Sequence, residues 1–300
     1  MQLTFLLFLQ RLSGPWFYRL AVLFSAFGEL ILPAFILFII YWNLSKKKAF
    51  AALGALIGAL LPANLLKAAL RCPRPFQAHP ALISPRLLSS ATGYSFPSGH
   101  ATTASSVYPS LALSFRKTWL KVLALALVIG ISLSRLYLGV HWPVDVMAGT
   151  LLGLASAVAL TGLMGRLWDD KDVFPALTRT AGSVSLFLSV VLSMLVDGGS
   201  VDFTAWGDLC TLFAMAGSTL LGMEAERKFA RFDETEGSPG KKTLRTVIGL
   251  SSTVLVAYVF QQLPLPHKAS TFVTIAMTMY WATFLYPLAG IKLRLFSETA

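Results

Sequence analysis

Long apolar segments recur along this chain of 300 residues, and they constrain its fold more than any other feature. A helix needs about 20 apolar residues to cross the hydrocarbon core of a bilayer. With 55% hydrophobic and only 13% charged residues, the composition excludes an ordinary soluble domain. We therefore expect an all-α, polytopic bundle of transmembrane helices. The predicted spans are 17–42, 49–69, 100–114, 119–136, 144–163, 182–196, 209–223, 246–262 and 271–290.

The N-terminal stretch from Met1 to Leu12 is also apolar, but it is too short to span a bilayer. It has neither the basic start nor the small-residue cleavage site of a signal peptide. We therefore expect residues 1–16 to form an interfacial segment with a helix that lies at the membrane surface.

Lysine and arginine are distributed unevenly between alternate loops. One set of loops holds most of them, for example Lys46 to Lys48 and the six basic residues from Arg227 to Arg245 inclusive. Because cytoplasmic loops carry the excess of basic residues, this set is predicted to be cytoplasmic. Nine spans then place the N-terminus outside and the C-terminus in the cytoplasm. The net charge of +11 acts as a topology signal, and no nucleic acid is expected as a partner.

The first polar motif lies at the outer end of the second predicted span. Lys67, Arg71 and Arg74 are spaced i, i+4, i+7, which would stack three cations on one helix face. Pro73 and Pro75 end the helix there. Three like charges favour a bound anion. The alternative is that the side chains snorkel to the lipid headgroups, and for Arg71 both interpretations stay open.

The second motif, Phe96 to Thr102, is typical of a turn that leads into a helix start. Ser98 is predicted as the N-cap, and Gly99 would let the backbone approach a ligand closely. Free amides at a helix start bind anions. His100 would then lie beside a bound phosphate, where an imidazolium can protonate the leaving oxygen. The alternative is an ordinary turn whose histidine has no catalytic role.

The third motif joins the fourth and fifth predicted spans. Ser134 and Arg135 close one span, and His141 to Asp145 opens the next, with Pro143 suited to a first helical turn. His141 and Asp145 are four residues apart. A carboxylate that holds one ring nitrogen leaves the other free to attack phosphorus, and Arg135 could clamp phosphate oxygens. The alternative is a histidine–aspartate pair that only seals a helix end.

Together the three motifs resemble those of the type 2 phosphatidic acid phosphatase superfamily, over residues 20–163. The resemblance implies a six-helix phosphatase core that works without a metal. It implies that His141 is the nucleophile that forms a phosphohistidine, that Asp145 orients it and that His100 is the general acid. The residues that would bind the phosphoryl group are Lys67, Arg74, Ser98, Gly99 and Arg135.

Other polar residues leave more room for interpretation. Arg71 is not a fixed position of the family, so its role stays open. Glu29 is predicted to lie mid-span in the first helix, where it could line the substrate entry or hydrogen-bond within the bundle. Cys72 and Cys210 form no metal-ligand or redox spacing. Because carboxylates and histidines are scarce outside the motifs, neither a metal nor another cofactor is expected.

The resemblance weakens after the fifth span. We predict a phosphatase core over 17–200 and a C-terminal transmembrane extension over 201–300 with about three further spans. Length and span count are similar to those of the sphingosine-1-phosphate phosphatase and glucose-6-phosphatase branches. The extension could form a homodimer surface or a lid over the substrate gate. A different hypothesis is that its spans transport lipids or solutes.

A lipid phosphate is the leading substrate hypothesis, because a site at the bilayer surface suits an amphiphile whose tail stays in the membrane. The candidates are isoprenyl diphosphates, phosphatidate, phosphatidylglycerol phosphate and sphingoid phosphates. The alternative is a soluble phosphomonoester such as glucose 6-phosphate, which would need hydroxyl-binding groups. The 76–96 loop offers several polar side chains without a discriminating pattern: Gln77, Ser84, Ser89, Ser90 and Thr92.

Overall fold

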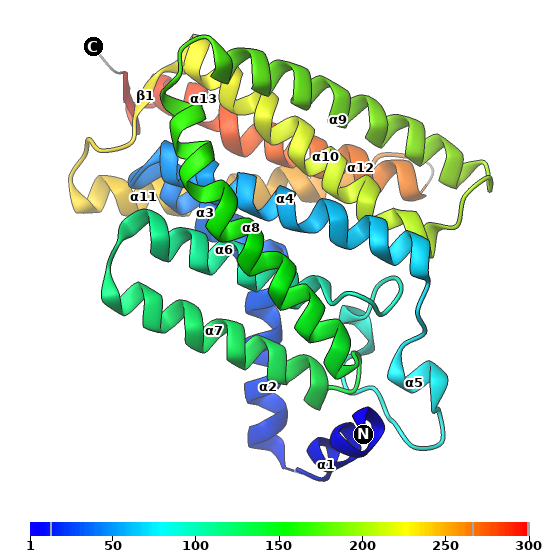
Figure 1. Ribbon diagram of the computed structural model, residues 1–300. Coiled ribbons are helices and arrows are strands. Elements are labelled where there is room, and N and C mark those ends of the chain that lie inside the picture. The colour runs from blue at the N-terminus through cyan, green and yellow to red at the C-terminus, as the bar shows by residue number, and fades with distance from the viewer. Residues whose placement is uncertain (13, 266, 299–300) are drawn as a thin grey trace. The chain divides into compact units, whose positions relative to one another are not determined.

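The computed structural model describes residues 1–12, 14–265 and 267–298, and helices make up most of this part of the chain (Figure 1). The all-α prediction is confirmed. The chain divides into two compact units, and each is described by itself here. The first unit comprises Met1–Ala34 and Ala51–Met164, and the second comprises Phe35–Phe50 and Gly165–Ala300.

The first unit contains the three sequence motifs. Two long helices, α4 and α8, and the helix α3 each contribute part of their length to it. The elements that contribute to this unit are α1 (Gln2–Arg11), α2 (Pro15–Gly28), α3 (Ile31–Asn43), α4 (Lys46–Leu70), α5 (Pro75–Ala78), the short 3₁₀ helix η1 (Leu88–Ser90), α6 (Gly99–Phe115), α7 (Thr118–Tyr137) and α8 (Pro143–Asp169).

The first predicted span, 17–42, is not one helix. It is divided into α2 and α3, and Glu29 has an extended backbone at the break. The reason is visible in the sequence, because Pro33 lies in the first turn of α3. A proline inside a helix clashes with the carbonyl of the residue four positions earlier, which here is Glu29. Pro33 therefore starts a new helix instead of continuing the old one.

Close helix packing holds the second motif in place. A Cβ atom added to Gly149 of α8 would lie only 2.6 Å from the carbonyl oxygen of Ser98, and one added to Gly153 would lie 2.6 Å from Cβ of Ser105. Only glycine permits this approach of α8 to the start of α6. The N-terminus of α6, which carries the second motif, is thereby fixed against the first turns of α8.

The N-terminal helix α1 forms as predicted, and it packs on the first unit. Leu6 is fully buried in a cluster with Ile83, Ala101, Leu136 and Val146. Its outer face remains apolar and exposed, as expected for a helix that also meets lipid; the exposed side chains include Phe5 and Phe8.

The second unit is built around α9 and α10, which pack closely where Gly182 faces Gly217. Arg245 is fully buried and donates hydrogen bonds to the carbonyl oxygens of Trp42 and Leu295. Besides its shares of α3, α4 and α8, this unit contains α9 (Val173–Asp197), α10 (Phe203–Ala225), the π-helix η2 (Glu226–Ala230), β1 (Phe232–Asp233), α11 (Pro239–Gln261), α12 (His267–Tyr280), the π-helix η3 (Trp281–Leu285), α13 (Tyr286–Lys292) and β2 (Ser297–Glu298). The two short strands pair antiparallel.

Six helical segments of the described chain are long and apolar enough to cross a membrane, and the divided pair α2–α3 would make a seventh. The predicted spans 100–114 and 209–223 correspond to α6 and α10, which are not among them. With 17 residues, α6 is shorter than the length of about 20 residues that a helix needs to cross the hydrocarbon core. Most residues of both α6 and α10 are buried by neighbouring helices. A helix enclosed in this way does not have to present apolar side chains to lipid.

Candidate phosphate site

His141 lies in the short link between α7 and α8, just before the first turn of α8. Its Nδ1 atom is 3.4 Å from Oδ2 of Asp145, and both side chains are buried. The predicted pair therefore exists, although His141 is outside the helix and does not share its face. At 3.4 Å the contact is at the long end of hydrogen-bond distances, which is common for catalytic pairs without substrate.

Asp145 is itself held by several donors. Its Oδ2 atom accepts a hydrogen bond of 2.5 Å from Oγ of Ser95 and one of 2.8 Å from the amide of Trp142. Its backbone carbonyl accepts from the amide of Ser98 at 3.0 Å. Asp145 thus connects the third motif with the second and has little freedom to move away from His141.

Arg74 is buried and reaches the other side of the His141 ring. Its Nη1 atom lies 3.2 Å from Nε2 of His141 and donates to the carbonyl of Val140 at 2.8 Å. Its Nε atom donates to the carbonyl of Gly93 at 3.0 Å, and Nη2 donates to the carbonyl of Thr92. The guanidinium is therefore fixed at the ring nitrogen that Asp145 leaves available.

The prediction that Lys67, Arg71 and Arg74 share one helix face is wrong. The helix α4 ends at Leu70, and Arg71 has a left-handed backbone with a φ of 49°. The exposed Arg71 side chain folds back to the carbonyl of Ala68. Because the left-handed residue turns the chain, Arg74 reaches His141 from outside the helix, whereas Arg71 makes no hydrogen bond with either residue.

Arg135 is fully buried in the last turn of α7, at the predicted end of that span. Its Nη1 atom donates to the hydroxyls of Ser25 and Ser90, at 2.6 and 3.0 Å, and Nη2 donates to the carbonyl of Ser90 at 3.0 Å. Three neutral acceptors orient the guanidinium, and none of them neutralises its charge.

Lys67 and the second motif complete the positive region. Lys67 is buried in the last turn of α4, and a Cβ atom added to Gly99 would lie 3.6 Å from its Nζ. Ser98 is the N-cap of α6, as predicted, but its side chain makes no capping hydrogen bond. The ammonium group therefore lies beside the N-terminus of α6, where the helix dipole also favours an anion.

Three buried polar atoms at these motifs lack a hydrogen-bond partner in the described part of the chain: Oγ of Ser98, Nε2 of His100 and Nε of Arg135. Buried polar groups are rarely left without a partner in native proteins, and such groups call for an explanation such as an absent ligand. A phosphoryl group, which offers several acceptor oxygens, could satisfy all three.

The surroundings of His141 keep its ring neutral. Burial, followed by the positive charges of Arg74, Arg135 and Lys67 and of His100, lowers the pKa of His141 well below its ordinary value of 6.5. A neutral ring has a lone pair on one nitrogen, and the contact with Asp145 assigns the proton to Nδ1. The lone pair is then on Nε2, beside Arg74.

Taken as one bent span, α2 and α3 place Glu29 near its middle, as the sequence predicted. Its side chain is exposed at the break between α2 and α3, and Pro33 is the cause of that break. Its side chain makes no hydrogen bond among the described residues, but its charge acts on that of Arg135. Both interpretations of Glu29, at the substrate entry or within the bundle, stay predictions.

Sequence reasoning missed the serines that hold the charged residues. Ser95 binds Asp145, and Ser25 and Ser90 bind Arg135. The sequence presents Ser90 only as one of several polar residues in the 76–96 loop. Nothing in the spacing of these serines distinguishes them from other loop or helix residues. Ser90 and Ser95 act through the path of the 87–95 segment, and Ser25 acts from α2, so only the tertiary structure reveals their role.

We found no group of three or more histidine, cysteine, aspartate or glutamate side chains that could hold a metal ion anywhere in residues 1–12, 14–265 and 267–298. The positive charge of the candidate phosphate site comes from three buried side chains, Lys67, Arg74 and Arg135.

Comparison with known proteins places the chain in a family. Residues 48–169 match the PAP2 superfamily, and residues 210–299 match the transmembrane extension of PAP2 superfamily phosphatases. The first match covers all three motifs, and the second covers most of the predicted C-terminal extension.

Curated relatives are lipid phosphatases. The chain is 48% identical over 62 residues to an undecaprenyl-diphosphatase of Sulfolobus acidocaldarius, covering 21% of this chain and 30% of the relative. It is 39% identical over 72 residues to phosphatidylglycerophosphatase B of Bacillus subtilis, covering 21% and 36%. It is 34% identical over 132 residues to a lipid A 1-phosphatase of Rhizobium etli, covering 40% and 56%.

The chain thus spans less than two thirds of the length of each of these relatives. The apolar helices and the match to a transmembrane extension make it a multi-pass integral membrane protein. With the three motifs gathered in one buried site and both family matches in order along the sequence, the chain belongs to the PAP2 superfamily of phosphatases.

Proposed function

We propose that this protein is an integral-membrane phosphatase that hydrolyses the phosphate or diphosphate headgroup of a lipid through a phosphohistidine on His141. The observation that carries the proposal is the buried constellation of His141 between Asp145 and Arg74, with Ser98, His100 and Arg135 each presenting an unpartnered polar atom.

In the first step, Nε2 of His141 attacks phosphorus and the bond from phosphorus to the lipid oxygen breaks. Asp145 stabilises the positive charge that develops on the ring. His100 gives a proton to the departing lipid oxygen. Lys67, Arg74 and Arg135 bind the phosphoryl oxygens, and their charges stabilise the transition state without a metal.

In the second step, water attacks the phosphohistidine. His100, now neutral, takes a proton from that water, the bond between phosphorus and Nε2 breaks, and inorganic phosphate leaves. This order follows from microscopic reversibility, because the group that protonates the first leaving oxygen is the natural base for the incoming one.

A lipid is the favoured substrate, because the relatives are named for lipid phosphates and because the site lies at the ends of apolar helices. We further propose that the site faces the periplasm or a lumen, since the loops on the opposite side carry the excess of lysine and arginine. The N-terminus would then lie outside and the C-terminus in the cytoplasm.

The proposal is tested by phosphate release from the purified full-length protein in detergent, with a chelator present. The panel contains an isoprenyl diphosphate, phosphatidate, phosphatidylglycerol phosphate, sphingosine phosphate and glucose 6-phosphate. We expect release from at least one lipid, and we expect His141→Ala to abolish it. His79→Ala is the matched control, because His79 lies outside the site and contacts the ring of Trp142 instead.

Release from glucose 6-phosphate alone would replace the lipid by a soluble substrate. Undiminished release from the His141→Ala variant would overturn the mechanism. Silence across the whole panel from well-folded protein would overturn hydrolysis and favour transport by the C-terminal spans.

A further inference from the structure

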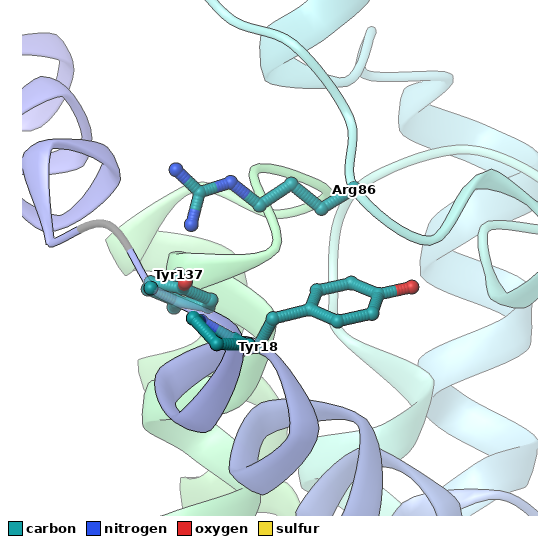
Figure 2. A pocket seen from close by; sticks show the side chains of 5 residues that line it. Tyr18, Arg86 and Tyr137 are labelled. Atoms are coloured by element: carbon teal, nitrogen blue, oxygen red, sulfur yellow. The ribbon is translucent and has the colours of Figure 1, made fainter.

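A pocket of about 430 Å³ opens beside the candidate phosphate site, and the mechanism above does not use it. Its lining residues come from the start of α2, from the end of α7 and from the loop before η1: Gly14, Pro15, Tyr18, Arg86 and Tyr137. Figure 2 shows the guanidinium of Arg86 over the ring of Tyr137, with Tyr18 extending from α2 in the opposite direction.

Arg86 is held in place but keeps donors for a ligand. Its Nη2 atom donates to the carbonyl of Gln10 at 2.6 Å, and Nη1 makes a long contact of 3.4 Å with the carbonyl of Leu12. Its guanidinium carbon lies 4.4 Å from the centre of the Tyr137 ring. Arginine has five N–H donors, so further ones remain, and no carboxylate pairs with its charge among the described residues.

The pocket combines this cation with two tyrosines. Tyr137 is 7% exposed and serves as a rigid wall, while Tyr18 is 39% exposed at the rim. Beyond the rim, Trp16, Phe17 and Leu20 of α2 form an exposed apolar surface, which is the expected position of lipid tails. A ligand here would place an anionic group at Arg86 and apolar chains along α2, which is the chemistry of a lipid and not of free phosphate.

The pocket is connected directly to the phosphate site. The amide of Arg86 donates to the carbonyl of Leu138, in the link that leads to His141. Four residues after Arg86, Ser90 binds Arg135. Because an extended chain spans at most about 3.6 Å per residue, the Cα atoms of Arg86 and Ser90 lie within about 14 Å of each other. Arg86 itself makes no hydrogen bond with Arg135 or His141 among the described residues.

We propose that Arg86, with Tyr18 and Tyr137, forms a subsite for a second anionic group, such as a second phosphate, of the same lipid substrate. This subsite rests on the proposed function and adds a substrate preference to that function. Lipids with two separated phosphates should be better substrates than lipids with one.

The test compares kcat/KM for phosphatidylglycerol phosphate, which carries a second phosphate, with kcat/KM for phosphatidate, which lacks it. Full-length wild type, Arg86→Gln and Arg86→Lys are measured in the same detergent. Arg19→Gln is the matched control, since Arg19 is an exposed arginine of α2 that contacts the ring of Trp16 and does not line the pocket.

We expect Arg86→Gln to lower kcat/KM for phosphatidylglycerol phosphate by about tenfold or more, the loss typical of one charge-assisted hydrogen bond. The loss for phosphatidate should stay within about twofold, Arg86→Lys should recover part of the selectivity, and Arg19→Gln should behave like wild type.

An equal loss on both lipids would overturn the subsite, because it would assign Arg86 a general structural role through Gln10. No loss on either lipid would also overturn the subsite. A wild type that hydrolyses phosphatidate but not phosphatidylglycerol phosphate would do the same. Both results would leave the proposed function standing. A wild type that is inactive on both and on the rest of the panel would instead refute the proposed function, and the subsite with it.

Discussion

Ser95 donates a hydrogen bond of 2.5 Å to Oδ2 of Asp145, the same oxygen that faces Nδ1 of His141. Hydrogen bonds to charged groups contribute about 1.5–3 kcal/mol. If Ser95 positions Asp145, Ser95→Ala should lower kcat about 10- to 100-fold with little change in KM, because substrate contacts stay intact.

The conservative variant distinguishes positioning from folding. Ser95→Thr keeps the hydroxyl and should retain most of the activity, whereas Ser95→Ala and Ser95→Val should both lose it. Equal losses in Ser95→Thr and Ser95→Ala, with a rise in KM, would show that the site needs the small side chain and not the hydrogen bond.

The pKa of His141 gives a prediction for the pH profile. Burial and neighbouring cations lower that pKa, so the neutral, nucleophilic ring persists below pH 6.5 and is lost only at more acidic pH. The acidic limb of kcat/KM, which reports the free enzyme, should therefore lie below pH 6.5 for the wild type.

Arg74→Gln provides the internal control for this assignment. Removal of that positive charge should raise the pKa of His141 and move the acidic limb to higher pH, in addition to lowering the rate. Because the substrate is the same in both profiles, its own ionisation cancels. A limb that does not move would show that another group controls it.

At the residue scale, the motifs identified which side chains gather, since order and spacing along the chain carry that information. Spacing could not predict where the Arg71 side chain lies. The chain leaves α4 at Arg71 through a left-handed backbone conformation, and helical spacing no longer applies beyond that point. Nor could it reveal Ser25, Ser90 and Ser95, which act through tertiary contacts alone.

At the scale of elements, the approach of α8 to α6 is the feature that fixes the second motif. A Cβ atom on Gly149 would lie 2.6 Å from the Ser98 carbonyl and 2.9 Å from Oγ1 of Thr102. Gly149→Ala should therefore destabilise the protein by about 1–3 kcal/mol, as overpacking usually does, and should displace Ser98. Thermal unfolding in detergent and phosphate release measure the two effects.

Gly162, about three and a half turns further along the same helix, is the matched control, since nothing lies within 4 Å of a Cβ atom added there. Gly162→Ala should be neutral, or stabilising by up to about 1 kcal/mol through helix propensity. If both alanine variants behave alike, the close contact at Gly149 does not determine the position of α6.

Hydropathy located the helices well, because membrane spans need continuous apolar sequence. It failed at the break in the first span, where Pro33 overrides apolar continuity. It also could not separate α6 and α10, which are enclosed by other helices, from helices that face lipid. The division of the sequence into segments 1–16, 17–200 and 201–300 remains a prediction.

At the scale of the whole molecule, the distribution of lysine and arginine predicts orientation. Ser238 caps α11 and is exposed in a loop predicted to be cytoplasmic. In a background where Cys72 and Cys210 are replaced by serine, Ser238→Cys should resist an impermeant thiol reagent in intact cells and react only after lysis.

Ser89→Cys is the opposite-side control, because Ser89 is exposed in η1 on the predicted outer side. It should react in intact cells. Rapid labelling at position 238 together with protection at position 89 would reverse the topology and place the site in the cytoplasm.

The central claim is that His141 carries the phosphoryl group during turnover. Full-length protein hydrolysing its best lipid substrate is quenched in alkali, where a phosphorylated imidazole survives, and its peptides are analysed by mass spectrometry. The account predicts one phosphoryl group on the peptide that contains His141, and none in His141→Ala. Phosphoryl transfer to a different residue, or steady turnover with His141 never modified, would contradict it.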